Sequence, residues 1–331
     1  MKALIVANTE YMENAISMVK GLRELGMEHG FFGYKSFCYR FGQEEMRKTL
    51  FSLIETHMPE WTFFQYQHAP IIKSDWFAEI KRINPTGKIS LMSVDMRNEL
   101  DEATIRAGQY ADVCFQKGRQ QLYRDRGLNC HIMQEGYSDI LFHKKNLPKK
   151  YNVVFAGNVY PHMQFPGTRE RVECMLYLSN RVEGLKVFGM GWQQILYHAV
   201  FGGTVKLPQV NDVYNSSKIV LNVNHYNDIE HYWSIRMIEG MASGSMVITR
   251  YIPGLEKYFT NFKDIIWFYS LTDCLDLIKY YLEHDDEREE IARNSQAVVR
   301  KDFRWEAIMK KAYDIVFRGG SGPEDSVDGS I

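Results

Sequence analysis

A serine, an arginine and a glutamate stand at positions 234, 236 and 239 of the stretch 233–249, Trp-Ser-Ile-Arg-Met-Ile-Glu-Gly-Met-Ala-Ser-Gly-Ser-Met-Val-Ile-Thr. Ser234 is a preferred N-cap residue, and the apolar periodicity predicts a short helix over 235–243 followed by a buried strand. Unpaired N–H groups at such a helix start, with Arg236 in the first turn, suit a phosphate. Glu239, one turn on, suits a ribose hydroxyl. The stretch therefore indicates a sugar-nucleotide site; an amphipathic helix with two solvated charges is the alternative.

The first half of the chain carries polar residues where predicted strands end. Apolar runs alternate with amphipathic segments up to residue 134, which predicts a mostly parallel, doubly wound sheet. Ligands of such sheets bind beyond the carboxyl ends of the strands. The polar residues there are Asn8, Thr9, His68 and Asp95.

Two of these residues are candidates for a general base. Asp95 lies in Ser-Val-Asp-Met-Arg, so Arg97 could keep its carboxylate ionised; the alternative is a structural ion pair. His68 has a side chain suited to proton transfer at neutral pH, although a lone histidine after an aromatic strand is also a common packing or turn residue. The sequence leaves open which of the two acts.

The composition bounds the class of protein. The 331 residues are 45% hydrophobic and 14% aromatic, enough for two cores. A net charge of −1 gives no general attraction for nucleic acid. The five cysteines form no Cys-x-x-Cys pair, which fits a reduced compartment and not a zinc site. Without a leader-like start or a long apolar run, we expect a cytoplasmic protein that does not span a membrane.

A charged, proline-containing segment divides the chain. We predict an N-terminal domain over 1–143, a linker over 144–150, a C-terminal domain over 151–302, a helix over 303–317 that crosses back, and a disordered tail over 318–331.

An ordered set of motifs in the second half resembles the GT-B glycosyltransferases, most closely the spore-maturation CgeB-like proteins. The motifs are Val153-Val-Phe-Ala-Gly-Asn-Val-Tyr-Pro161, Val187-Phe-Gly-Met-Gly-Trp192, Val213-Tyr-Asn-Ser-Ser-Lys-Ile-Val-Leu-Asn222, Arg236-Met-Ile-Glu-Gly-Met-Ala-Ser-Gly244 and Tyr280-Tyr-Leu-Glu-His284 with Glu287-Arg-Glu-Glu-Ile-Ala292. The resemblance implies two Rossmann-like parallel-sheet domains that face a cleft. It also implies transfer of a sugar from a nucleotide donor, with Glu239 at the ribose.

One position departs from that pattern. Many retaining GT-B enzymes have a glutamate eight positions before the one matched by Glu239, whereas this chain has His231. The stereochemical outcome therefore stays open, and in a retaining enzyme Asp95 and His68 need only hold the sugar.

The expected donor is a UDP-sugar in preference to a GDP-sugar, with no cofactor. The sequence lacks an Asp-x-Asp metal motif, so we expect Arg236, Arg169 and the helix start to neutralise the diphosphate without a metal. The predicted donor-binding residues are Gly157, Asn158, Arg169, Gly189, Trp192, Val210, Tyr232, Ser234, Ile235, Arg236 and Glu239, and the acceptor-side residues are Asn8, Thr9 and Arg97.

The acceptor hydroxyl is undetermined: a glycan, a protein, a small molecule or a hydroxymethylated base in DNA. A basic stretch could follow a DNA backbone, or it could be a solvated helix face; it comprises Lys117, Arg119, Tyr123, Arg124 and Arg126. A non-catalytic protein that binds nucleotide sugars or glycans is the alternative to an enzyme. A dinucleotide oxidoreductase is disfavoured because no Gly-x-Gly-x-x-Gly follows the first strand.

Overall fold

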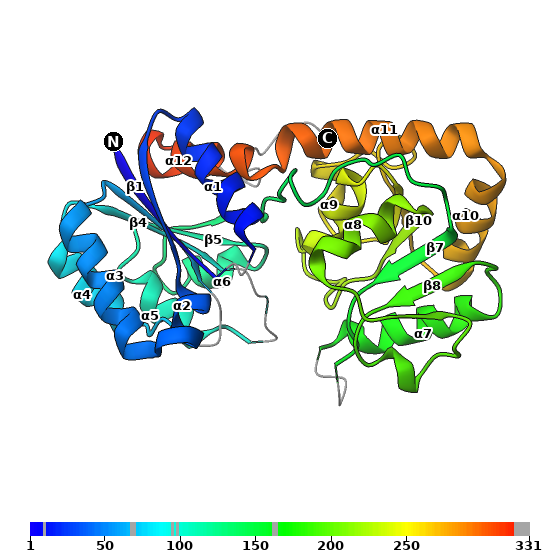
Figure 1. Cartoon of the computed structure of the whole chain (residues 1–331), viewed down its shortest axis with the longest axis horizontal. Coiled ribbons are helices and arrows are strands. Elements are labelled where there is room, and N and C mark those ends of the chain that lie inside the picture. Colours follow the sequence, from blue (N-terminus) through cyan, green and yellow to red (C-terminus); the bar gives the residue numbers. More distant parts are fainter. Residues whose placement is uncertain (9–10, 67–70, 94–95, 97–98, 161–164, 321–331) are drawn as a thin grey trace. The chain divides into compact units, whose positions relative to one another are not determined.

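The computed structural model describes residues 1–8, 11–66, 71–93, 96, 99–160 and 165–320 (Figure 1). The chain forms two compact units, residues 1–138 with the segment from Arg304 onward, and residues 139–303. Each unit contains a six-stranded parallel sheet flanked by helices. The predicted fold class, two doubly wound α/β domains, is confirmed.

The sheet of the first unit has the strand order β2-β1-β3-β4-β5-β6. Its strands are β1 Lys2–Ala7, β2 Glu28–Gly33, β3 Trp61–Tyr66, β4 Lys88–Ser93, β5 Val113–Gln116 and β6 Cys130–Ile132. All six residues of β3 are buried, as a central parallel strand covered on both faces requires.

Helices cover both faces of this sheet. They are α1 Met12–Glu24, α2 Tyr34–Phe41, α3 Gln43–His57, α4 Trp76–Ile83, α5 Glu102–Gly108, α6 Gln120–Arg124 and α12 Trp305–Arg318. The chain's last helix, α12, packs along α1, where a Cβ on Gly21 would stand only 2.8 Å from the Met309 Cβ. Gly21 therefore allows the close approach of these two helices. The helix α2 was not predicted from the sequence.

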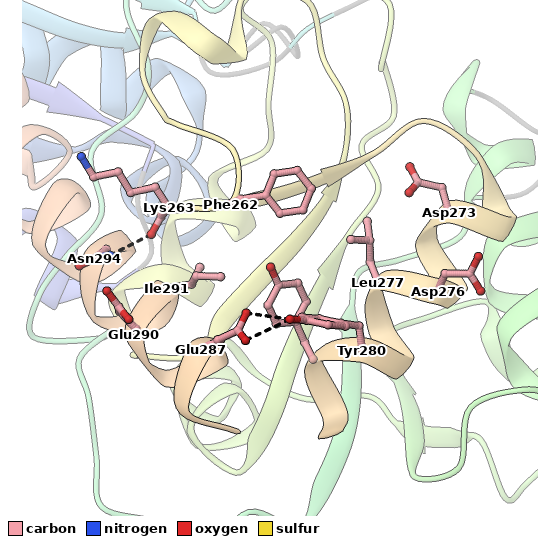
Figure 2. Close-up of a pocket in the computed structure, with 11 residues that line it drawn as sticks. Phe262, Lys263, Asp273, Asp276, Leu277, Tyr280, Glu287, Glu290, Ile291 and Asn294 are labelled. Carbon is pink, nitrogen blue, oxygen red and sulfur yellow. Dashed lines mark hydrogen bonds between the residues drawn. The ribbon is translucent and has the colours of Figure 1, made fainter. Parts of the chain in front are cut away.

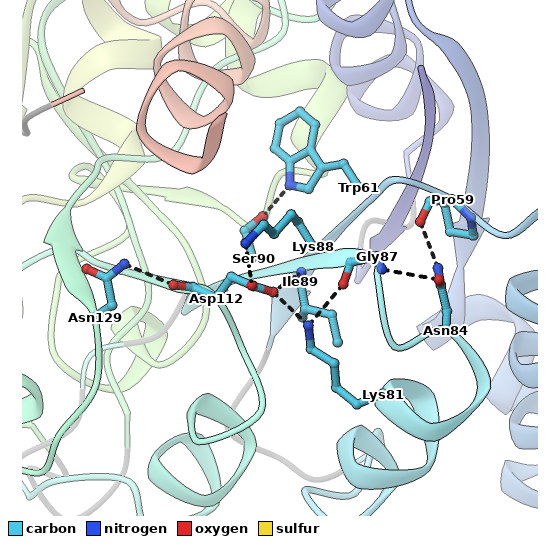
Figure 3. A network of polar contacts seen from close by, with 10 residues as sticks. All are labelled: Pro59, Trp61, Lys81, Asn84, Gly87, Lys88, Ile89, Ser90, Asp112 and Asn129. Carbon is cyan, nitrogen blue, oxygen red and sulfur yellow. Dashed lines mark hydrogen bonds and ion pairs between the residues drawn. The ribbon is translucent and has the colours of Figure 1, made fainter. Parts of the chain in front are cut away.

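A polar network fixes α4 to the amino ends of β4 and β5 (Figure 3). The Asp112 carboxylate, just before β5, accepts hydrogen bonds from Lys81 Nζ at 2.8 Å, Lys88 Nζ at 3.0 Å and the Ile89 amide at 2.8 Å. Burial opposes ionisation, but these donors outweigh it and lower the pKa of Asp112.

The second unit has the strand order β12-β11-β10-β7-β8-β9. Its strands are β7 Tyr151–Ala156, β8 Leu185–Phe188, β9 Phe201–Gly203, β10 Ser217–Asn222, β11 Met246–Arg250 and β12 Ile266–Phe268. Its α-helices are α7 Gly167–Ser179, α8 Leu207–Asn215, α9 Ile235–Ala242, α10 Leu271–Glu283 and α11 Asp285–Asp302. The short edge strand β9 was not predicted. The segment before β7 is held along α8, where Asn215 Oδ1 accepts the Lys145 amide.

Candidate anion-binding site of the second unit

The helix α9 begins at Ile235, as the sequence predicted, and ends at Ala242, one residue before the predicted end. Ser234 occupies the N-cap position, but its hydroxyl does not cap the helix. The Ser234 Oγ instead donates to Asn222 Oδ1 at 3.2 Å, so Ser234 is the N-cap residue, as predicted, but supplies no side-chain cap.

Two amide groups at the start of α9 remain available. The Ser234 amide donates to Asn224 Oδ1 at 2.8 Å, and the Met237 amide donates to the Ser234 carbonyl at 3.1 Å. The amides of Ile235 and Arg236 have no acceptor among the residues that the structure describes. Both residues are half-buried, so this helix end has two N–H groups for an anion.

The side chain of Arg236 adds a formal charge beside these amides. Its Nη2 atom is buried and has no hydrogen-bond partner within the described chain. Its Nε lies 3.4 Å from the place where a Cβ on Gly157 would stand, at the carboxyl end of β7. A buried guanidinium nitrogen without a partner is costly, and an anionic ligand would satisfy it.

A second arginine lies close by. Arg171 of α7 is completely buried and donates to the Val223 carbonyl at 2.8 and 3.1 Å and to the Asn158 carbonyl at 2.8 Å. Neither Arg171 nor Arg236 pairs with a carboxylate of the described chain. Burial, and then the charge of Arg236, lower the pKa of Arg171.

His225 lies beside the two arginines and has a neutral ring. We call Arg171, Arg236 and His225 the cationic cluster. Its Nε2 lies 2.9 Å from Arg171 Nη1. Burial, followed by the charges of Arg171 and Arg236, lowers the pKa of His225 to about 2. The cluster therefore concentrates positive charge that is not paired directly with a carboxylate of the described residues, which favours an anion.

Glycines bring two loops beside this cluster. Gly189 has a φ of +135°, and a Cβ there would stand 2.3 Å from the Gly157 carbonyl oxygen. Gly191 has a φ of +88° and would place a Cβ 2.4 Å from the Val159 carbonyl oxygen. Asn158 Oδ1 accepts the Met190 amide at 2.9 Å. The loops after β7 and β8 thus pack backbone against backbone, and only glycine fits at both crossing points.

Other predicted donor-binding residues have different surroundings. Trp192 is completely buried, stacks edge-on against Phe155 and donates to the Gly157 carbonyl at 2.6 Å, so it supports the loop from the core. Tyr232 and Val210 are also buried. Arg169 is 79% exposed and pairs with Glu173 at 2.7 Å.

Glu239 is buried on α9, one turn after the helix start. Burial, and then the negative charge of the Glu239 carboxylate, raise the pKa of the Tyr214 hydroxyl on α8. The predicted ribose-binding residue is thus part of the same helix as the anion-binding amides.

Sequence reasoning missed Arg171, although a signal was present. Thr168, Val172 and Met175 lie on the buried face of α7, and Arg171 falls at the same helical phase. An arginine on an apolar face requires acceptors or an anion, whereas Arg169 falls on the exposed face.

The structure does not describe most of the site residues predicted in the first unit. Thr9, His68, Asp95 and Arg97 lie outside the residues that the structure describes, and Asn8 follows β1 as a half-buried residue. Near the carboxyl ends of the neighbouring strands, the buried Lys117 forms an ion pair with the half-buried Glu135.

The predicted basic stretch is partly directed inward. Lys117 is buried in its pair with Glu135, and Arg124 Nε donates to the Cys130 carbonyl at 2.6 Å. Arg126 pairs with Glu102 at 3.3 Å. Several of its charges are thus already engaged within the first unit.

A separate pocket of about 670 Å³ lies between α10 and α11 (Figure 2). Its lining includes one cation, Lys263, and four carboxylates, Asp273, Asp276, Glu287 and Glu290. Both oxygens of Glu287 accept from Tyr280 at 3.0 Å. The negative charge of this pocket makes it unsuitable for a diphosphate.

Within the described ranges, no three His, Cys, Asp or Glu residues gather as a metal site would require. No helix in the described part of the chain combines the length and apolar character needed to cross a bilayer.

Comparison with known proteins gives one family match. Residues 169–314 match the family model described as glycosyl transferase-like. No curated protein matches the sequence.

Solved structures share the fold over nearly the whole chain. Anabaena HepE in complex with UDP-glucose is 12% identical, with a TM-score of 0.65, covering 96% of this chain and 99% of that one. Sucrose-phosphate synthase from Thermosynechococcus elongatus is 14% identical, with a TM-score of 0.66 and the same coverage. The DNA-modifying enzyme β-glucosyltransferase is 14% identical, with a TM-score of 0.62 and again 96% and 99% coverage. Residues 169–314 thus match a glycosyl transferase-like family, and the chain shares the GT-B fold of these glycosyltransferases.

Proposed function

We propose that this chain is a glycosyltransferase that moves a sugar from a UDP-sugar to an acceptor hydroxyl without a metal. The observation that carries the proposal is the start of α9, where two amides and the buried Nη2 of Arg236 have no partner in the part of the chain that the structure describes. An anion with several oxygens would satisfy all of these donors, and a diphosphate is such an anion.

The diphosphate is the leaving group of the proposed reaction. As the bond between the anomeric carbon and the phosphate oxygen breaks, its electron pair moves onto that oxygen. The added charge is stabilised by the amides of Ile235 and Arg236 and by the guanidinium of Arg236. Arg171, buried close to Arg236, adds its positive charge. These groups can replace a metal ion in this role.

Glu239 is assigned to the ribose hydroxyls in this proposal. Gly157, Asn158 and Gly189 are assigned to close backbone approach beside the phosphates. Ser234 and Tyr232 flank the helix start. Uridine is favoured because Anabaena HepE was solved with UDP and UDP-glucose, and β-glucosyltransferase was studied with uridine diphosphoglucose.

The first unit is proposed to present the acceptor. Asp95, held ionised by Arg97, or else His68, takes the proton of the acceptor hydroxyl as its oxygen attacks the anomeric carbon. Asn8 and Thr9 are proposed to contact the acceptor.

A direct assay tests the activity. The purified chain is incubated with UDP-glucose or GDP-glucose, with and without EDTA, and release of the nucleoside diphosphate is measured. The acceptors are a glycan set, a protein lysate and duplex DNA containing hydroxymethylcytosine. We expect release of UDP that EDTA leaves unchanged and that Arg236→Gln abolishes, whereas Arg181→Gln on the surface of the same unit retains it. Absence of UDP binding by the native chain would contradict the proposal.

A further inference from the structure

Two buried asparagines accept hydrogen bonds from Ser234, the residue just before α9. Asn222 ends β10, and Asn224 follows two residues later; their exposed fractions are 3% and 0%. Asn222 Oδ1 accepts the Ser234 hydroxyl, and Asn222 Nδ2 donates to Thr249 Oγ1 of β11 at 2.9 Å. Asn224 Oδ1 accepts the Ser234 amide at 2.8 Å.

This arrangement accounts for the uncapped helix start. A serine at an N-cap normally turns its oxygen toward the amide two or three residues on. Here Asn222 accepts the Ser234 hydroxyl instead, and Asn224 accepts the Ser234 amide. The asparagines thus satisfy the hydroxyl and the amide of Ser234, and the next two amides, those of Ile235 and Arg236, have no acceptor among the described residues.

The asparagines are themselves anchored. The Asn224 amide donates to Asn227 Oδ1 at 3.1 Å, and Asn227 Nδ2 donates to Glu170 of α7 at 2.8 Å. The other carboxylate oxygen of Glu170 accepts from Arg250 Nε of β11 at 2.6 Å. Three elements of the second unit therefore fix the segment that leads into α9.

We propose that Asn222 and Asn224 are positioning residues that keep the start of α9 uncapped so that its amides can bind the donor's diphosphate. This inference rests on the proposed function. The asparagines act through Ser234 and α9. The helix lacks the stability that a side-chain cap would add, and its first amides can bind the ligand instead.

The test compares a ligand that has the diphosphate with one that lacks it. UDP and uridine are titrated by calorimetry, or by NMR where uridine binds weakly, into the native chain, Asn224→Ala, Asn222→Ala and the control Asn152→Ala. Asn152 lies on β7 of the same sheet and donates to the Glu183 carbonyl at 2.9 Å, away from α9.

We expect Asn224→Ala and Asn222→Ala to weaken UDP binding at least about tenfold while uridine binding changes less than about twofold. In Asn222→Ala the Ser234 hydroxyl is free to cap α9 and compete with the phosphate. Asn152→Ala should bind both ligands as the native chain does. A purely structural defect would weaken both ligands together.

Each result of this test supports or overturns the inference about Asn222 and Asn224. Unchanged UDP affinity in both variants, with native UDP binding intact, overturns this inference alone. Equal weakening of UDP and uridine also overturns it. Failure of the native chain to bind UDP overturns the proposed function and this inference with it. A variant that lacks a cooperative thermal transition is set aside, and the other asparagine variant gives the decision.

Discussion

A Cβ on Gly157 would stand 3.4 Å from the Nε of Arg236. A methyl group at this position would therefore be in ordinary van der Waals contact with the guanidinium. The same Cβ would lie 3.0 Å from the Phe155 ring, which packs against the buried Trp192. Gly157 is thus confined between the core of the second unit and the arginine at the start of α9.

Gly157→Ala is expected to weaken UDP binding. The added methyl group would crowd the Phe155 ring at 3.0 Å, so that the ring must shift by a few tenths of an ångström, and it would stand in van der Waals contact with Arg236, where it takes up space proposed for the diphosphate. We expect UDP affinity to fall about tenfold, or ~1.4 kcal/mol. Calorimetric titration with UDP measures this loss. Gly30→Ala in the first unit is the control, since its Cβ would meet only a Leu4 methyl group at 3.1 Å. Equal UDP affinity in native protein and both variants would contradict the proposed place of Gly157 beside the diphosphate.

Arg236→Gln is expected to weaken UDP binding without destabilising the free protein. Loss of charge-assisted hydrogen bonds to the diphosphate costs about 1.5–3 kcal/mol, which is roughly ten- to a hundredfold in affinity. The free protein loses no ion pair with the substitution, because Arg236 pairs with no carboxylate of the described chain. Titration with UDP and thermal melting without ligand measure the two effects, and Arg181→Gln is the matched control. A large drop in the melting temperature of the free variant would show that Arg236 is mainly structural.

The sequence predicted the fold because its signals were local. Apolar runs and amphipathic spacing are set by neighbouring residues, so most strands and the start of α9 fell within a few positions of those observed. The order of the strands within each sheet and the short strand β9 depend on contacts between distant segments, which local patterns do not contain.

The site was predicted less completely because its details depend on tertiary contacts. Ser234 has the right residue type and position for an N-cap, but its hydroxyl bonds to Asn222, twelve residues earlier. Arg171 of α7 and His225, three residues after β10, meet only through the tertiary fold, with Arg171 bonded to the carbonyl of Val223. No spacing rule along the chain connects these residues.

Asp112→Asn is expected to destabilise the first unit at neutral pH. The pKa of Asp112 is lowered in the folded chain, so its carboxylate contributes stability above the unfolded value near 4 and loses it as pH falls through the folded value. We expect a loss of about 1–3 kcal/mol at pH 7 that shrinks toward zero as the native carboxylate is protonated. Denaturant unfolding of the native chain, Asp112→Asn and the surface control Asp125→Asn between pH 2.5 and 7 measures this. A difference that is constant with pH would show that the charge of Asp112 is unimportant.

His225 is expected to make the second unit less stable in mild acid. Its folded pKa is about 2, because burial and then Arg171 and Arg236 disfavour the imidazolium, whereas the unfolded ring takes up a proton below about 6.5. The unfolded state then binds more protons, so the free energy of unfolding falls with decreasing pH below about 6.5, by up to ~1.4 kcal/mol per pH unit.

The variant His225→Gln separates this contribution from that of other groups. It loses the contact with Arg171 at every pH, so its stability is lower throughout, but the pH dependence due to residue 225 is absent. Denaturant unfolding between pH 4 and 8 should therefore give a shallower slope for His225→Gln than for the native chain, while His198→Gln on the surface keeps the native slope. Added UDP should reduce the native slope, because a diphosphate beside Arg171 and Arg236 offsets their charge and raises the pKa of the ring. Parallel slopes for the native chain and His225→Gln would contradict the neutral ring, and a native slope that UDP leaves unchanged would place the diphosphate away from this cluster.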